Sequence, residues 1–265
     1  MHVRASDSPV VVVEGPDDAL VLKPHLEGAQ FFPAAGKPNA IETARDLIES
    51  GISDFTCITD PDFDDPLDFA DLASVHHPYE GADLEAMLIG LGVLALVLEH
   101  TGSRPKIQAA GGPDAVVRLL IRLAAPVSRL RAASRRQAWG IAFDEVEIEK
   151  YVDSKGEMRL KVPEYCLALR RRTLDVLRNS DGNVSAVPSD AVMISSCDSD
   201  CDADALRFRG KDVLALASVA TRRQFGNLSK AASDKDLLCN QLHSSSGLLL
   251  SRSNWLAVLK RRVGA

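Results

Sequence analysis

Residues 10–18 read Val-Val-Val-Val-Glu-Gly-Pro-Asp-Asp, and residues 55–64 read Phe-Thr-Cys-Ile-Thr-Asp-Pro-Asp-Phe-Asp. Each stretch is a short apolar or β-branched run that stops at carboxylates. A run of this length between turn residues is typical of a strand buried on both faces of a parallel sheet. Open α/β sheets place their sites at the carboxyl ends of the strands. The acidic residues after the two runs are therefore expected at one edge of the sheet.

Four carboxylates are predicted to meet at this edge, and they belong to Glu14, Asp60, Asp62 and Asp64. Like charges this close repel one another unless a cation is bound among them. Carboxylate oxygens are hard ligands, which favour Mg²⁺ or Mn²⁺. The alternative interpretation is a pair of solvated acidic turns without a site.

The neighbouring segments alternate between strand and helix. Further strands are expected over residues 30–33 and 72–76, and a helix is expected to run from Pro16 until Gly28. A second helix over residues 39–50 would begin with a capping box. This alternation predicts an α/β fold, in which right-handed crossovers join the strands of a parallel sheet.

Three more residues near this edge are candidates for the site, and each also has an ordinary structural explanation. Asp18 is either a further metal ligand or an acid that complements the dipole of a helix's first turn. Lys37 lies in a loop without the Walker pattern, and it either contacts a phosphate or is solvated. Glu85 is either a site residue or an acid in the first turn of a helix that opens near Asp83.

A strand ending in Glu-Gly, followed by a strand ending in Asp-x-Asp-x-Asp, resembles the Toprim domain of topoisomerases, primases and overcoming-lysogenisation nucleases. Four stretches, at residues 13–18, 32–39, 58–64 and 83–88, are similar to the anti-phage defence branch of this family, which includes the effector of the PARIS system. The resemblance covers the chain to about residue 90 and is thin after residue 100.

The resemblance implies a Rossmann-like Toprim catalytic domain over residues 1–100. It implies Glu14 as a metal ligand or general acid–base group, and Asp60 and Asp62 as metal ligands, with Asp64 as a further ligand. Lys37 would touch the scissile phosphate. One or two Mg²⁺ or Mn²⁺ ions would serve as the cofactor.

The function implied by the resemblance is a Mg²⁺-dependent nuclease that hydrolyses RNA or DNA. Such a protein would be a toxin effector of an anti-phage system, restrained by a partner ATPase. A homodimer is a further alternative for its oligomeric state. The alternatives are a primase-like nucleotidyl transferase and a regulatory module that binds metal or a protein without turnover. The complete acidic set favours a nuclease over the regulatory module.

Residues 101–265 are expected to form a mainly helical accessory region, packed on the core, with a small β-element between residues 140 and 162. The region from 118 to 136 holds six arginines, although the net charge of the chain is −6. Arg118, Arg122 and Arg129 approximate one helix face, which is either a track for nucleic-acid phosphates or a solvated surface.

Five cysteines, an odd and scattered set, argue for a reducing compartment. Residues 1–8 are polar, and the longest apolar stretch, 87–98, is shorter than the ~20 residues that cross a bilayer. A cytoplasmic location is therefore expected. Residues 197–204 hold Asp at every second position and Cys at 197 and 201, but Ala203 and Arg209 stand where an EF-hand needs Gly and Glu. With no second ligand pair for zinc nearby, a solvated acidic loop is preferred.

Overall fold

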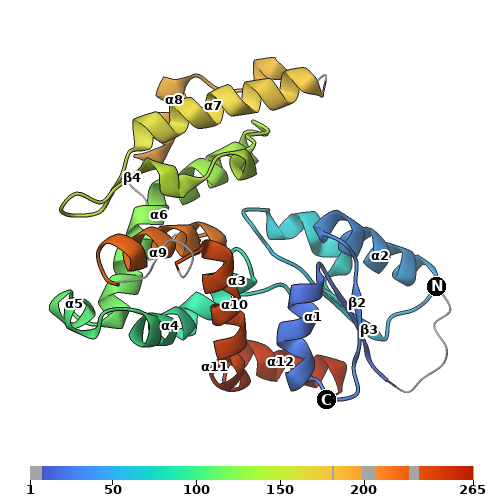
Figure 1. Cartoon of the computed structure of the whole chain (residues 1–265). Coiled ribbons are helices and arrows are strands. Elements are labelled where there is room, and N and C mark those ends of the chain that lie inside the picture. Colours follow the sequence, from blue (N-terminus) through green and yellow to red (C-terminus); the bar gives the residue numbers. More distant parts are fainter. Residues whose placement is uncertain (1–7, 181, 199–206, 227–232, 265) are drawn as a thin grey trace. The chain divides into compact units, whose positions relative to one another are not determined.

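The computed structural model describes residues 8–180, 182–198, 207–226 and 233–264 (Figure 1). The chain divides into two compact units, one formed by residues 1–93 with 242–265 and the other by residues 94–241. Residues 242–265 thus belong to the unit of the N-terminal sheet, whereas they were predicted to be part of the helical accessory region.

A parallel sheet of three strands lies at the centre of the first unit, with the strand order β2-β1-β3. Its strands are β1 (Val10–Val13), β2 (Gln30–Pro33) and β3 (Phe55–Ile58). Val11, Val12 and Val13 of β1 and all four residues of β3 are buried, as expected for strands covered on both faces, and Val10 is partly buried. The predicted mixed α/β class with a parallel sheet is confirmed.

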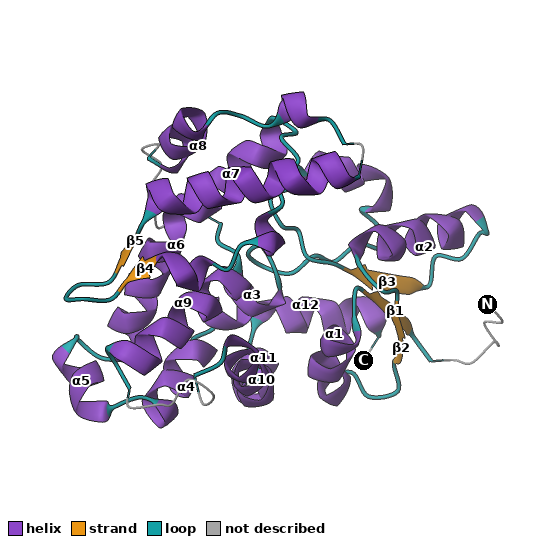
Figure 2. Ribbon diagram, turned by 45° about the horizontal axis from the view of Figure 1, so that its top comes forward, coloured by secondary structure: helices purple, strands orange, loops and turns teal. Residues whose placement is uncertain are grey.

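Helices cover both faces of this sheet. The chain passes from β1 to β2 through α1 (Pro16–Leu22) and a 3₁₀ turn at Lys23–His25, and from β2 to β3 through α2 (Lys37–Glu49). These two connections run in opposite directions across the sheet, and Figure 2 shows α1 and α2 on opposite faces. The direction changes between β1 and β3, and α/β proteins bind ligands beside such a switch point.

Two local predictions about the first unit are wrong. Residues 72–76 do not form a fourth strand, because Pro66–Leu72 is a 3₁₀ helix and His76 makes only an isolated parallel bridge to Cys57. The capping box at Asn39 does not form either, since α2 starts two residues earlier, with Gly36 as its N-cap. Gly36 has a φ of 113°, which a glycine adopts more readily than any other residue.

The C-terminal helix α12 (Asn254–Val263) packs against β3 on the same face as α1 (Figure 2). Its Trp255 ring is 4.9 Å from the ring of His77 and 5.2 Å from that of Tyr79, measured between centroids. The Trp255 indole N–H donates to the Pro78 carbonyl at 2.8 Å. The last helix of the chain is therefore part of the core that surrounds the N-terminal sheet.

The second unit is built mainly of helices, and it also holds the predicted small β-element. The hairpin pairs β4 (Val152–Asp153) with β5 (Arg159–Leu160) in antiparallel fashion.

The other helices in the described residues of both units are α3 (Leu84–Gly90), α4 (Val93–Thr101), α5 (Arg104–Ala109), α6 (Pro113–Arg136), α7 (Val162–Asn179), α8 (Asp190–Cys197), α9 (Gly210–Arg223), α10 (Lys235–Ser245) and α11 (Gly247–Ser251), with 3₁₀ turns at Phe143–Glu145, Ile148–Tyr151 and Val184–Ala186.

The helix α6 organises the second unit by packing against α8 and α9. Arg131 on α6 donates through Nε and Nη2 of its guanidinium to the two carboxylate oxygens of Asp212 on α9, at 2.8 and 2.9 Å. Both side chains are largely buried. The guanidinium also lies over the ring of Phe143, 4.2 Å from its centroid. A bidentate pair of this kind fixes both the distance and the orientation of two helices.

In the part of the chain that the structure describes, no single helix combines the length and apolarity needed to span a membrane. The consecutive helices α3 and α4 reach that length and composition only when they are taken together.

Candidate functional site

Glu14 and Asp60 meet at the carboxyl edge of the sheet, as the sequence predicts. Glu14 follows β1, and Asp60 lies two residues beyond the end of β3. The Asp60 backbone N–H donates to Oε1 of Glu14 at 2.8 Å. Because β1 and β3 are neighbours in the sheet, the chain brings these two acids together across 46 positions of sequence.

Burial makes the charged forms of both carboxyl groups unfavourable. It raises the pKa of Glu14 to about 7, against the lowering effect of the hydrogen bond from Asp60. Burial, followed by the charges of Glu14 and Asp83, raises the pKa of Asp60 to about 9. Perturbation of this size in a group of acids is typical of functional sites.

The amino end of α3 holds the Asp60 side chain in place. Oδ1 of Asp60 accepts a hydrogen bond from the Leu84 backbone N–H at 3.1 Å. Asp83, which is 1% exposed, is the N-cap of this helix and accepts from the Ala86 N–H at 2.7 Å. Asp83 was not among the predicted site residues, although the start of a helix at this position was the available signal.

Asp62 and Asp64 are both paired with Lys37. The Lys37 ammonium lies 3.0 Å from Oδ2 of Asp62 and 2.5 Å from Oδ2 of Asp64. Burial lowers the pKa of Lys37, but the two carboxylates outweigh it, and the net pKa is raised. The predicted proximity of Lys37 to the acidic edge is therefore present, as an ion-paired side chain at the amino end of α2.

The Asp62 backbone has a left-handed conformation with a φ of 47°. Its N–H donates to the Ala82 carbonyl at 2.7 Å, which ties the loop after β3 to the segment before α3. Asp and Asn adopt this conformation more easily than other residues with a Cβ atom. The turn thus has a conformational reason for an aspartate that is separate from any ligand role.

Asp18 uses both carboxylate oxygens within the first unit. Oδ2 accepts from the Gly15 N–H at 2.8 Å and so caps α1, and Oδ1 accepts from the buried Tyr79 hydroxyl at 2.6 Å. Tyr79 in turn stacks on Trp255. Asp18 thus caps a helix, and its charge also raises the pKa values of Glu14 and Asp60.

Buried carboxyl groups that repel one another gain stability when a divalent cation neutralises them. Among the described residues, however, Glu14, Asp60 and Asp62 do not form a set of three whose ligand atoms lie within 4.8 Å of one another. The Asp62 carboxylate is directed to Lys37 instead. Glu14 and Asp60 are therefore the two candidate ligands that already lie together. Asp62 would join them only if its carboxylate turned away from Lys37.

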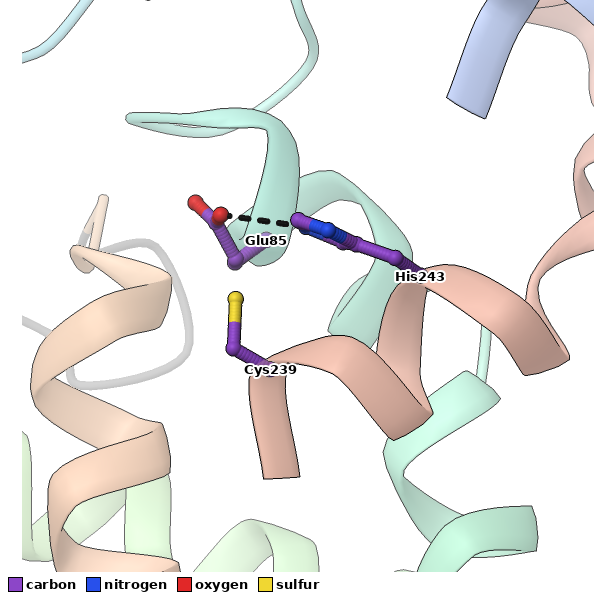
Figure 3. A group of neighbouring side chains, drawn as sticks. All are labelled: Glu85, Cys239 and His243. Carbon is purple, nitrogen blue, oxygen red and sulfur yellow. Dashed lines mark hydrogen bonds and ion pairs between the residues drawn. The ribbon is translucent and has the colours of Figure 1, made fainter. Parts of the chain in front are cut away.

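Glu85 lies in the first turn of α3, as one of its two interpretations expects, and its side chain pairs with a histidine. Its Oε1 lies 3.2 Å from Nε2 of His243, and both side chains are more than nine-tenths buried. Figure 3 shows this pair, together with Cys239, one turn before His243 on α10. His243 was not a candidate in the sequence, because 158 positions separate it from Glu85.

The three predicted nucleic-acid contacts do not share one environment. Arg118 and Arg122 are exposed on α6. Arg129 is partly buried, and its Nη1 donates to the carbonyl oxygen of Cys197 at 2.9 Å. Arg129 thus joins α6 to α8, which is a structural role, and only the first two arginines keep a solvent-facing position.

No protein-family model matches the chain, and a comparison with curated proteins finds no match either.

Proposed function

We propose that the first unit is a divalent-metal-dependent phosphodiesterase that cleaves RNA or DNA. The observation that carries this proposal is the hydrogen-bonded approach of Glu14 and Asp60 at the switch point of a parallel sheet. Acids with raised pKa values at such an edge are equipped to hold a cation and to move protons. On the basis of the motif resemblance, we further propose that the fold of this unit is a Toprim core.

Each residue of the edge has a task in the proposed reaction. Asp60 and Asp62 are the metal ligands. The amino end of α3 orients Asp60, and the loop after β3 positions Asp62. Glu14, with a pKa of about 7, is suited to exchange a proton with water or with the leaving oxygen near neutral pH. A bound Mg²⁺ or Mn²⁺ would supply charge stabilisation for the phosphate and a more acidic water. The Lys37 ammonium would attract a non-bridging phosphate oxygen.

The biological setting of the proposal comes from the resemblance alone. Under it, the chain is a toxin effector of an anti-phage defence system, and a partner ATPase restrains its cleavage of nucleic acid. That restraint predicts that the isolated chain is active without its partner.

One observation favours a second candidate, a regulatory module that binds metal or a protein partner without turnover. Lys37 neutralises Asp62 and Asp64, so a cation already occupies part of the acidic edge. If this ion pair persists with substrate present, the edge retains too few free oxygens for catalysis.

A cleavage assay on end-labelled RNA, single-stranded DNA and duplex DNA separates the two candidates. We expect cleavage of at least one substrate with Mg²⁺ or Mn²⁺ and none with EDTA. Glu14→Gln and Asp60→Asn should each lower the rate by about 10²-fold or more.

Asp54→Asn is the matched control, because Asp54 is exposed and precedes β3 at the opposite edge of the sheet. It should retain the wild-type rate. Absence of cleavage by folded wild-type protein on every substrate would favour the regulatory module. Equal rates for Glu14→Gln, Asp60→Asn and wild type would rule out this edge as the active site.

A further inference from the structure

The second unit holds two cysteines whose thiols touch. Cys166 lies in the second turn of α7, and Cys197 is the last residue of α8. Their sulfur atoms are 3.8 Å apart, although 31 positions separate the residues in sequence. Both side chains are buried, at 0% and 1% exposure.

The distance lies within reach of a covalent bond. A disulfide has an S–S length of about 2.05 Å, so the sulfurs need to approach by less than about 2 Å. Closing this gap would need a rotation about χ1 and a small shift of the α8 end. The helices α7 and α8 are already packed together, so the cross-link would join elements that are neighbours in the fold.

The shared hydrogen bond makes the two thiols unequal. Either thiol can donate this hydrogen bond. When Cys197 donates, the bond lowers the pKa of Cys166, while the same bond and burial raise the pKa of Cys197. The nucleophile in thiol oxidation is the thiolate. In that arrangement Cys166 is the first residue to react, and Cys197 resolves the intermediate.

We propose that Cys166 and Cys197 form a redox-responsive dithiol, and that oxidation by a peroxide joins α7 to α8 through a disulfide bond. The Cys166 thiolate attacks one peroxide oxygen, which breaks the O–O bond and yields a sulfenic acid and water after protonation. The Cys197 thiol then attacks the sulfenic sulfur and releases a second water. The net change converts two thiols and one hydrogen peroxide into one disulfide and two waters.

This chemistry is separate from the proposed cleavage reaction, because both cysteines lie in the unit that does not contain Glu14 and Asp60. The simplest competing explanation is that both cysteines are small apolar core residues. Cys57 fits that description: it is buried in β3, its thiol contacts the Ala40 carbonyl at 3.7 Å, and burial raises its pKa to about 12.

The test uses the full chain with Cys57, Cys201 and Cys239 replaced by serine, so that only the pair remains. The protein is incubated with hydrogen peroxide, with and without urea below the unfolding midpoint, because the buried thiols need transient opening to react. We expect a monomer that has lost two hydrogen atoms by intact mass, and no thiol that can be alkylated after denaturation. Dithiothreitol should restore both thiols.

The oxidised form should melt higher than the reduced form by about 5 °C, since the bridge restricts the unfolded chain. Cys166→Ser in the same background should show neither the mass change nor the shift. Failure to form the intramolecular bond in urea, or its formation without any rise in melting temperature, would overturn the proposal.

Wild-type protein gives an independent answer if the triple variant fails to fold. After oxidation, digestion with trypsin and a protease that cleaves before Asp separates Cys197 from Cys201, since Asp198 and Asp200 lie between them. A linked pair of peptides that contain Cys166 and Cys197 is the expected product. Linkage of Cys166 to Cys201 instead, or of neither, would contradict the assignment.

Discussion

The folded protein disfavours the charged form of single carboxyl groups at the sheet edge, and Asp60 is the clearest example. Its carboxyl group is buried beside Glu14 and Asp83, and a backbone N–H of α3 orients it. Glu14 faces the Asp60 backbone and has a raised pKa of its own. The free energy of unfolding of the metal-free protein should therefore depend strongly on pH.

We expect metal-free protein to become less stable as the pH rises from about 5 to about 9. The unfolded acids have pKa values near 4, so the unfolded chain releases these protons first and the folded protein binds more of them throughout this window. A state that binds more protons loses stability as the pH rises. Urea unfolding across this range measures the effect, and millimolar Mg²⁺ should flatten the profile. A rise in stability towards pH 9 in EDTA would contradict the burial of these acids.

Lys37 offers a second test at the residue scale. Lys37→Gln should lower the free energy of unfolding by about 1–2 kcal/mol, a value reduced for partial solvent screening, because Asp62 and Asp64 lose their shared partner. The same change should raise Mg²⁺ affinity, since it removes the ammonium that pairs with two carboxylates. Lys23→Gln, at an exposed lysine, is the control for both measurements. Weaker Mg²⁺ binding by Lys37→Gln would show that Lys37 supports the ion instead of competing with it.

At the scale of elements, α12 closes one face of the sheet through Trp255, which stacks on His77 and Tyr79. Through Tyr79 this contact continues to Asp18 and the start of α1. Ser253 caps α12 by accepting from the Leu256 N–H at 3.1 Å. The packing of the last helix therefore supports the residues around the acidic edge.

Trp255→Ala should destabilise the protein by about 3–5 kcal/mol, because it removes a buried ring and leaves a cavity. Leu248→Ala, on α11 where the side chain is 60% exposed, should change stability by less than about 0.5 kcal/mol. Chemical unfolding followed by circular dichroism measures both. If the two substitutions have equal effects, α12 does not contribute to the core as described.

For the molecule as a whole, an acidic edge that binds nucleic acid needs a separate surface that attracts phosphates. Arg118 and Arg122 remain the best candidates because they are exposed, whereas Arg129 and Arg131 contact other helices of their own unit. The run Arg170–Arg172 is the next candidate, although Arg170 and Arg172 already pair with Asp190 and Glu145.

The double change Arg118→Ala with Arg122→Ala should reduce the slope of log affinity against log salt by about 1.4–1.8, which corresponds to two lost phosphate contacts. Fluorescence anisotropy with single-stranded and duplex probes provides the measurement. Arg178→Ala, on an exposed part of α7, should leave the slope unchanged. An unaltered slope in the double variant would indicate a solvated face.

The sequence predicted the sheet and its acidic edge because both depend on local patterns: apolar runs, their abrupt ends and the alternation of strand and helix. It placed Glu14 and Asp60 together correctly for the same reason. It could not predict the contacts of Trp255 and His243, since pairs separated by 178 and 158 positions leave no periodic signal. The predicted fourth strand does not form because Leu72 ends a 3₁₀ helix and residues 73–75 are turns, with the N–H groups of Val75 and His76 both donating to the Leu72 carbonyl. Residues 199–204 of the Cys-Asp segment lie outside the described residues.

The central claim, that Glu14 and Asp60 form the core of a divalent-metal centre, is tested most directly by calorimetric titration of Mn²⁺ into EDTA-treated protein at neutral pH. Wild type and the Asp54→Asn control should bind Mn²⁺ equally, and Asp60→Asn should bind at least about tenfold more weakly while circular dichroism shows an intact fold. Wild-type affinity in Asp60→Asn, or no heat of binding in any of the three proteins, would contradict the metal centre.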